Sequence, residues 1–103
     1  MVLKRGLPGI KERDIRKVVV DYLRWQGWVV LYHLQGLGCR PGMPDLQALR
    51  DGRCVFIELK TATGRQSDSQ AAFQAEVQAA GFEYLLCRGI EDLERVGIHE
   101  ATE

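Results

Sequence analysis

The dipeptide Asp51-Gly52 restricts the fold more than any other feature, because it separates two largely apolar runs, residues 45–50 and 53–60. A type I′ turn needs positive φ at both central positions, which Asp and Gly tolerate. The pattern therefore predicts a β-hairpin with a two-residue loop. If this dipeptide is the loop, the residues that flank it pair with each other, and the register of the whole hairpin follows.

In this register Asp45 lies opposite Glu58, and Lys60 follows on the same side of the sheet together with Phe56 and Cys54. Two opposed carboxylates repel each other, so a positive group must compensate. Either Lys60 forms an ion pair, or a divalent cation binds, since Mg²⁺ is commonly held by one or two carboxylates. The other face is predicted to be the apolar core face, and it carries Leu46, Ala48, Val55, Ile57 and Leu59.

The remaining elements follow from hydrophobic periodicity and from Gly and Ser punctuation. The sequence predicts helices at 11–26, at about 67–80 and at 89–97, a buried strand at 28–33, and a strand at 83–87. The order is helix, three strands, helix, strand, helix. It predicts an α/β fold with a mixed four-stranded sheet flanked by helices, whose last strand joins in parallel through a helical crossover.

The chain has 103 residues, which fits one domain spanning 1–103. Cys39, Cys54 and Cys87 are odd in number and far apart, which argues against disulfides or a zinc finger and favours the reducing cytoplasm. No apolar run approaches the roughly 20 residues of a membrane helix, and the start lacks the apolar core of a signal peptide. A core of this size is small, so homodimerisation is a plausible way to bury more surface, with Trp25 and Trp28 in the core or in that interface.

The net charge of zero hides an asymmetry, because residues 1–40 carry eight Lys and Arg against three acids. Such a basic segment can attract phosphate, or it can be an ordinary solvated helix face. Its clustered members are Lys4, Arg5, Lys11, Arg13, Arg16 and Lys17.

Two short motifs on the predicted hairpin resemble a known signature. GMPDL at 42–46 and IELK at 57–60 resemble the PD…ExK motif of the PD-(D/E)XK nuclease superfamily. The run from Arg40 to Leu46 is similar to the RxGxPDL pattern of the VRR-NUC (virus-type replication-repair nuclease) family. Glu12 and the SDSQ run at 67–70 match further elements of that family, so the resemblance covers about residues 10–90.

The resemblance implies a restriction-endonuclease-like fold and a Mg²⁺- or Mn²⁺-dependent DNA endonuclease. By analogy, Asp45 and Glu58 are direct metal ligands, and the backbone carbonyl of Leu59 is a third. Glu12 would hold the metal through water or bind a second ion, although an acid also simply favours a helix N-terminus.

Lys60 would position the attacking water and stabilise negative charge at phosphorus, and Gln70 would orient Lys60 or that water. Gln70 also stands three residues after Ser67 as in a capping box, and both roles are expected to hold only if its side chain is not committed to Ser67. His33 is expected to be a packed strand residue rather than a general base.

The expected DNA contacts are Arg40, Arg65, Lys11 and Lys17. Arg40 can instead pair with an acid, and Arg65 can be a solvated loop residue. The glycines near the motif, including Gly42, either form turns or allow close approach of the backbone to DNA.

The short chain resembles the stand-alone phage or viral type of the family, whose members are homodimers that cut four-way (Holliday) junctions, here in the bacterial host cytoplasm if the chain is phage-encoded. Two alternatives stay open. One is a nuclease of the same superfamily that acts on linear or single-stranded DNA. The other is a non-catalytic DNA-binding module that kept the fold.

Overall fold

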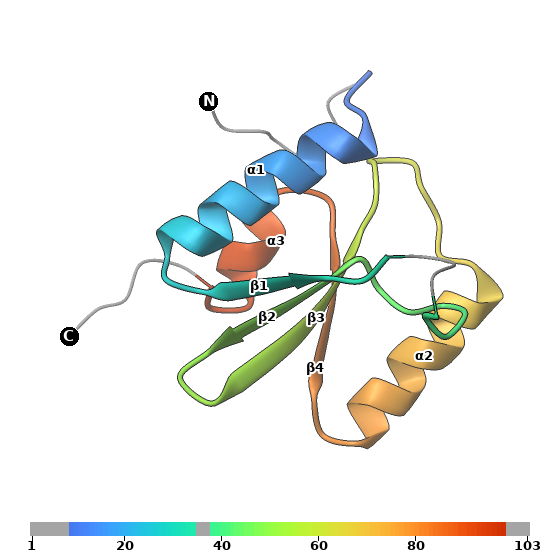
Figure 1. Cartoon of the computed structure of the whole chain (residues 1–103). Helices are drawn as coiled ribbons and strands as arrows, with labels where there is room; N and C mark the ends of the chain where they lie inside the picture. Colours follow the sequence, from blue (N-terminus) through green and yellow to red (C-terminus); the bar gives the residue numbers. More distant parts are fainter. Residues whose placement is uncertain (1–8, 35–37, 99–103) are drawn as a thin grey trace.

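The computed structural model describes residues 9–34 and 38–98, so the Lys4 and Arg5 part of the basic segment lies outside the described residues. The element order agrees with the sequence prediction, and the ends differ by a residue or two (Figure 1). The elements are α1 (Glu12–Trp25), β1 (Val29–Tyr32), β2 (Leu46–Arg50), β3 (Arg53–Leu59), α2 (Asp68–Ala79), β4 (Glu83–Cys87) and α3 (Ile90–Arg95).

The four strands form one sheet in the order β1-β2-β3-β4. The first two pairs are antiparallel, and β3 and β4 are parallel, as the helical crossover predicts. Asp51 and Gly52 both have positive φ, 49° and 78°, as a type I′ turn requires. The predicted register is confirmed, since Leu46 pairs with Ile57 and Arg50 with Arg53.

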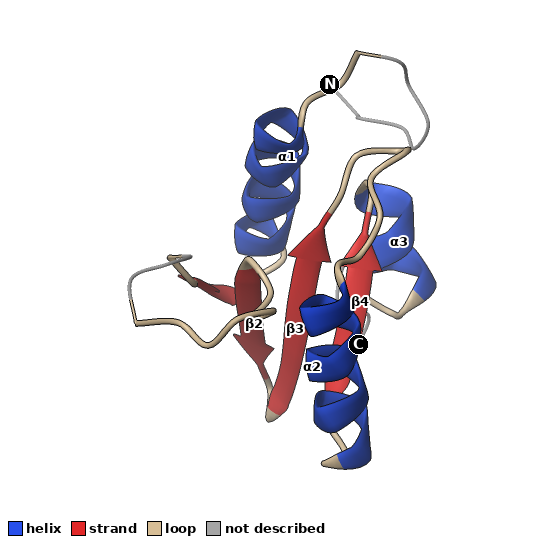
Figure 2. Ribbon diagram, turned by 90° about the vertical axis from the view of Figure 1, so that its right-hand side faces the viewer, coloured by secondary structure: helices blue, strands red, loops and turns tan. Residues whose placement is uncertain are grey.

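Helices cover both faces of the sheet (Figures 1 and 2). The predicted apolar face of the hairpin is fully buried in the main core beneath α1 and α3. The opposite face is covered by α2, whose Phe73 packs edge-on against Phe56 of β3, with ring centroids 5.7 Å apart. The main core consists of residues from α1, the sheet and the C-terminal segment, among them Ile15, Val19, Leu23, Leu46, Val55, Ile57, Leu59, Leu93 and Ile98.

The prediction of a buried strand at 28–33 is wrong. Trp28 is buried, but Val29, Leu31 and Tyr32 are 57%, 43% and 48% exposed. The reason lies in the position of this strand. β1 is an edge strand, and α2 packs on β4 at the far edge of the sheet, so one side of β1 has no covering helix.

Arg53 joins several elements at the end of the sheet near the hairpin turn. Its guanidinium donates to both carboxylate oxygens of Glu83 at 2.8 and 2.7 Å and to the carbonyl of Val96 at 2.7 Å. It also lies over the Trp28 ring, 5.7 Å from the centroid. The Arg53 hydrogen bond lowers the pKa of Glu83, and Glu83 in turn raises the pKa of Arg53. β3, β4 and the end of α3 are thereby tied together.

No helix within the described residues is long and apolar enough to cross a membrane.

Candidate active site

The candidate residues gather at the end of the sheet that lies away from the hairpin turn. Asp45 immediately precedes β2, Glu58 lies near the end of β3, and Lys60 follows that strand. The first turn of α2 brings Gln70 to Glu58, and the first residue of α1 is Glu12. The hairpin register and the two helix starts therefore bring together five residues that the sequence singled out.

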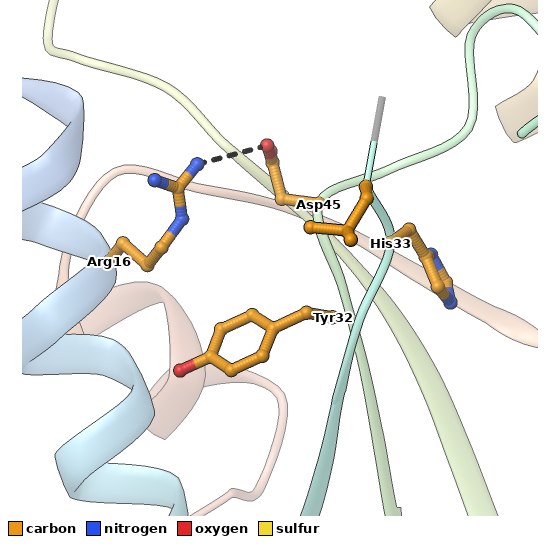
Figure 3. A pocket seen from close by; sticks show the side chains of 5 residues that line it. Arg16, Tyr32, His33 and Asp45 are labelled. Carbon is orange, nitrogen blue, oxygen red and sulfur yellow. Dashed lines mark hydrogen bonds and ion pairs between the residues drawn. The ribbon is translucent and has the colours of Figure 1, made fainter. Parts of the chain in front are cut away.

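Asp45 is held in the plane of the sheet rather than on one face. Its Oδ2 accepts a hydrogen bond from the backbone N–H of Leu59 at 2.9 Å, and strand N–H groups point along the sheet. Its Oδ1 lies 3.3 Å from Nη2 of Arg16, which reaches across from α1 (Figure 3). Asp45 thus contacts α1, whereas Glu58 contacts α2, so the two carboxylates do not share one face as strict alternation predicts.

Glu58 is a buried carboxylate with an unused oxygen. The residue is only 3% exposed, and its Oε2 accepts from Nε2 of Gln70 at 2.9 Å and lies 3.6 Å from Nζ of Lys60. Its Oε1 is buried with no hydrogen-bond partner among the described residues. Burial, followed by the negative charge of Asp45, raises the pKa of Glu58 to about 7. Lys60 therefore compensates the two acids only in part.

Gln70 caps α2 and holds Glu58 at the same time. Its Oε1 accepts from the backbone N–H of Ser67 at 2.8 Å, while Oγ of Ser67 accepts from the backbone N–H of Gln70 at 3.2 Å. Its Nε2 donates to Glu58. The amide has an acceptor end and a donor end, so capping leaves Gln70 a donor for the site, and that donor contacts Glu58 rather than Lys60.

Gly42 explains why the motif loop lies against α2. Its φ is +85°, and a Cβ placed there would meet the carbonyl oxygen of Ser69 at 2.1 Å and the backbone nitrogen of Gln70 at 2.9 Å. Only a glycine allows this contact between the loop backbone and the first turn of the helix. Gly42 thus allows the motif loop to pack against the first turn of α2, which carries Gln70.

Sequence reasoning missed the roles of two arginines. Nη2 of Arg16 lies between Asp45 and Glu12, 3.3 and 3.5 Å from their oxygens, and only the i,i+4 spacing to Glu12 could have indicated it. Arg88 donates to the backbone carbonyls of Thr61 and, at 2.9 Å, Gly64. It thereby holds the loop that follows Lys60, and no sequence pattern points to that contact.

A pocket of about 260 Å³ opens beside Arg16, between α1 and β1 (Figure 3). The His33 ring is turned away from Arg16 and Asp45. Its Nδ1 lies 2.9 Å from the carbonyl oxygen of Pro44, and its Nε2 lies 3.2 Å from the side chain of Gln47, as expected for a packed strand residue. The lining residues are Arg16, Tyr32, His33, Leu34 and Asp45.

Of the four residues expected to contact DNA, two form ion pairs within the chain and two are exposed. Arg40 forms an ion pair with Glu76 and lies over the ring of Phe73, so in this structure it pairs with an acid, which was the alternative expectation. Lys17 pairs with Asp21 at 2.9 Å on the exposed side of α1. The remaining two expected contacts, Lys11 and Arg65, are exposed.

Among the described residues, no group of three or more His, Cys, Asp or Glu side chains is arranged to hold a metal ion. The chemistry of the site is nevertheless suited to a small hard cation, which prefers oxygen ligands and needs only one or two carboxylates. The unpartnered Oε1 of Glu58, close to the charge of Asp45, is an oxygen of the kind that such a cation prefers. The residues present therefore fit Mg²⁺ or Mn²⁺.

The mixed sheet with helices on both faces defines a restriction-endonuclease-like α/β domain, with acidic and lysine side chains at the ends of β2 and β3. The sequence profile of the VRR-NUC domain matches residues 29–91, which is more than half of the chain. The chain therefore belongs to the VRR-NUC domain family, as the sequence motifs predict. A UPF0102 protein of Synechococcus sp. (strain JA-3-3Ab) is 38% identical over 60 residues. The match covers 58% of this chain but only 44% of that protein, so the chain spans less than half of the relative.

Proposed function

We propose that the chain is a metal-dependent DNA endonuclease that hydrolyses phosphodiester bonds. The observation that carries this proposal is the buried Oε1 of Glu58, which has no hydrogen-bond partner in the described structure and lies close to Asp45. Leaving a buried charged group unsatisfied is costly, so such an oxygen calls for a cation.

Asp45, Glu58 and the backbone carbonyl of Leu59 would hold Mg²⁺ or Mn²⁺, with Glu12 as a further ligand, directly or through water. When bound, the ion would supply Lewis acidity and make water a better nucleophile near neutral pH. The ammonium of Lys60, 3.6 Å from Glu58, would orient the attacking water and stabilise negative charge at phosphorus. The expected products are a 5′-phosphate and a 3′-hydroxyl.

We further propose branched DNA, such as a four-way junction, as the preferred substrate of a homodimer. Support for a dimer comes from exposed apolar side chains along β1 and the end of α1. A two-fold dimer would direct two sites at opposite strands of a symmetric junction. Arg40, Arg65, Lys11 and Lys17 would contact phosphates, in a reducing, cytoplasmic setting.

The test is a cleavage assay on a four-way junction, a linear duplex and a single strand of the same sequences, with Mg²⁺ or Mn²⁺. We expect the junction to be cut fastest. Asp45→Ala and Lys60→Ala should each lower the rate by at least ~100-fold, because the first removes a ligand of the ion and the second removes the ammonium that stabilises negative charge at phosphorus.

Glu94→Ala, an exposed acid on α3, is the matched control and should cut like the parent chain. Equal cutting of all three DNAs would favour a nuclease without branch selectivity. Binding of DNA without cutting, together with no uptake of Mn²⁺ in calorimetry, would favour a non-catalytic module.

A further inference from the structure

Arg16 lies between two acids that come from distant parts of the chain. Its Nη2 is 3.3 Å from Oδ1 of Asp45 and 3.5 Å from Oε1 of Glu12. Glu12 is one helical turn away on α1, whereas Asp45 is 29 residues further along the chain. One guanidinium thus supplies positive charge to two of the three carboxylates that interact at this end of the sheet.

The contact uses the part of Asp45 that a cation would need. Oδ2 of Asp45 accepts the N–H of Leu59, and Arg16 lies against Oδ1, so both oxygens of this carboxylate already have a partner. A divalent ion bound to Asp45 and the guanidinium would be like charges a few ångströms apart, and their repulsion opposes joint occupancy. The ion and Arg16 therefore compete for the same carboxylate.

Arg16 has room to leave. Its side chain is 39% exposed and borders the 260 Å³ pocket between α1 and β1 (Figure 3). Partly exposed ion pairs at these distances are weak, so a divalent ion is able to displace Arg16.

We infer that Arg16 is an internal counter-ion that holds Asp45 and Glu12 in the ion-free protein and competes with the divalent cation for them. This inference rests on the proposed metal-dependent function and adds a positioning residue to it. Arg16 keeps the acids in place before the ion arrives and weakens binding of that ion by the strength of its own contacts.

Calorimetric titration with Mn²⁺ alone tests the inference by comparing Arg16→Met with the parent chain. We expect the Kd of Arg16→Met for Mn²⁺ to fall by about 3- to 10-fold, because a competitor of modest strength is removed. Lys17→Met is the matched control. It removes the same charge one residue along the same helix, where Lys17 pairs with Asp21, and should change the Kd by less than about twofold, since exposed charges are screened.

Thermal unfolding gives a second measurement that needs no catalysis. Without divalent ions, Arg16→Met should melt at a lower temperature than the parent, and saturating Mn²⁺ should remove that difference. Arg16→Lys keeps the charge and should stay close to the parent. If Arg16→Met does not fold, Arg16→Gln replaces it as the uncharged variant in both measurements.

Equal Mn²⁺ affinity in Arg16→Met and Lys17→Met, or weaker binding in Arg16→Met, would overturn the inference and leave the proposed function standing. A parent chain that takes up no Mn²⁺ would overturn both.

Discussion

Glu58 occupies the least favourable electrostatic position among the described acids of the site. It is buried, next to Asp45, and its pKa is raised to about 7 against an ordinary value of 4.5. In the ion-free protein, the Glu58 carboxyl group therefore binds its proton more tightly in the folded state than in the unfolded state. The stabilisation is complete below pH 4.5 and is lost as the pH rises through about 7, with an upper limit of about 3 kcal/mol.

Glu58→Gln should remove this pH dependence. In EDTA, we expect the free energy of unfolding of the parent chain to decrease from pH 5 to pH 8, while Glu58→Gln changes less and is the more stable protein at pH 8. Urea denaturation at several pH values measures both. The exposed Glu94→Gln variant should follow the parent, and identical pH profiles for the parent and Glu58→Gln would refute the prediction.

At the scale of elements, the hairpin was the most predictable part of the molecule. A two-residue turn fixes every pair by arithmetic, and alternation assigns the core face. The order of helices and strands followed from periodicity, and the motif residues, as the hairpin register predicts, gather at one end of the sheet. The direction of Asp45, the exposure of β1 and the identity of the acid that pairs with Arg40 were not predictable, because they depend on how elements far apart in sequence pack together.

The contact between the Gly42 loop and α2 leads to a prediction at the same scale. Gly42→Ala should be destabilising by roughly 2–4 kcal/mol, because its Cβ collides with the α2 backbone in addition to the strain of positive φ. The displaced first turn should also release Gln70 from Glu58 and lower the cleavage rate.

Gly81→Ala is the control for the backbone strain alone. Gly81 has a φ of +89°, but its Cβ would meet no atom within 4 Å. We expect this variant to lose only about 1–2 kcal/mol and to keep its activity. Equal losses in the two variants, measured by urea denaturation, would show that the close approach at Gly42 is unimportant.

At the scale of the whole molecule, the surface around the edge strand β1 exposes several large apolar side chains. Val29, Leu31 and Tyr32 of β1 are exposed, and so are Trp25 at the end of α1 and Leu34 just after β1. Exposed apolar side chains next to an unpaired strand edge favour self-association. They support the proposed homodimer, and the 86% exposure of Trp25 excludes it from the core.

Leu31→Lys should convert the proposed dimer into a folded monomer, because it places a charge in the middle of this surface. Sedimentation equilibrium measures the mass, and circular dichroism checks the fold. Phe82→Lys is the control, since Phe82 is 54% exposed just before β4 and should leave the dimer intact. A parent chain that is monomeric throughout, or a dimeric Leu31→Lys variant, would contradict the proposed assembly.

The contacts of Arg53 near the hairpin turn have a practical consequence for the mutational experiments proposed above. Arg53 joins β3, β4 and the end of α3 at the end of the sheet opposite the carboxylates. Substitutions of Asp45 and Lys60 are therefore expected to leave these contacts intact, whereas replacement of Arg53 would remove the hydrogen bonds that join the three elements.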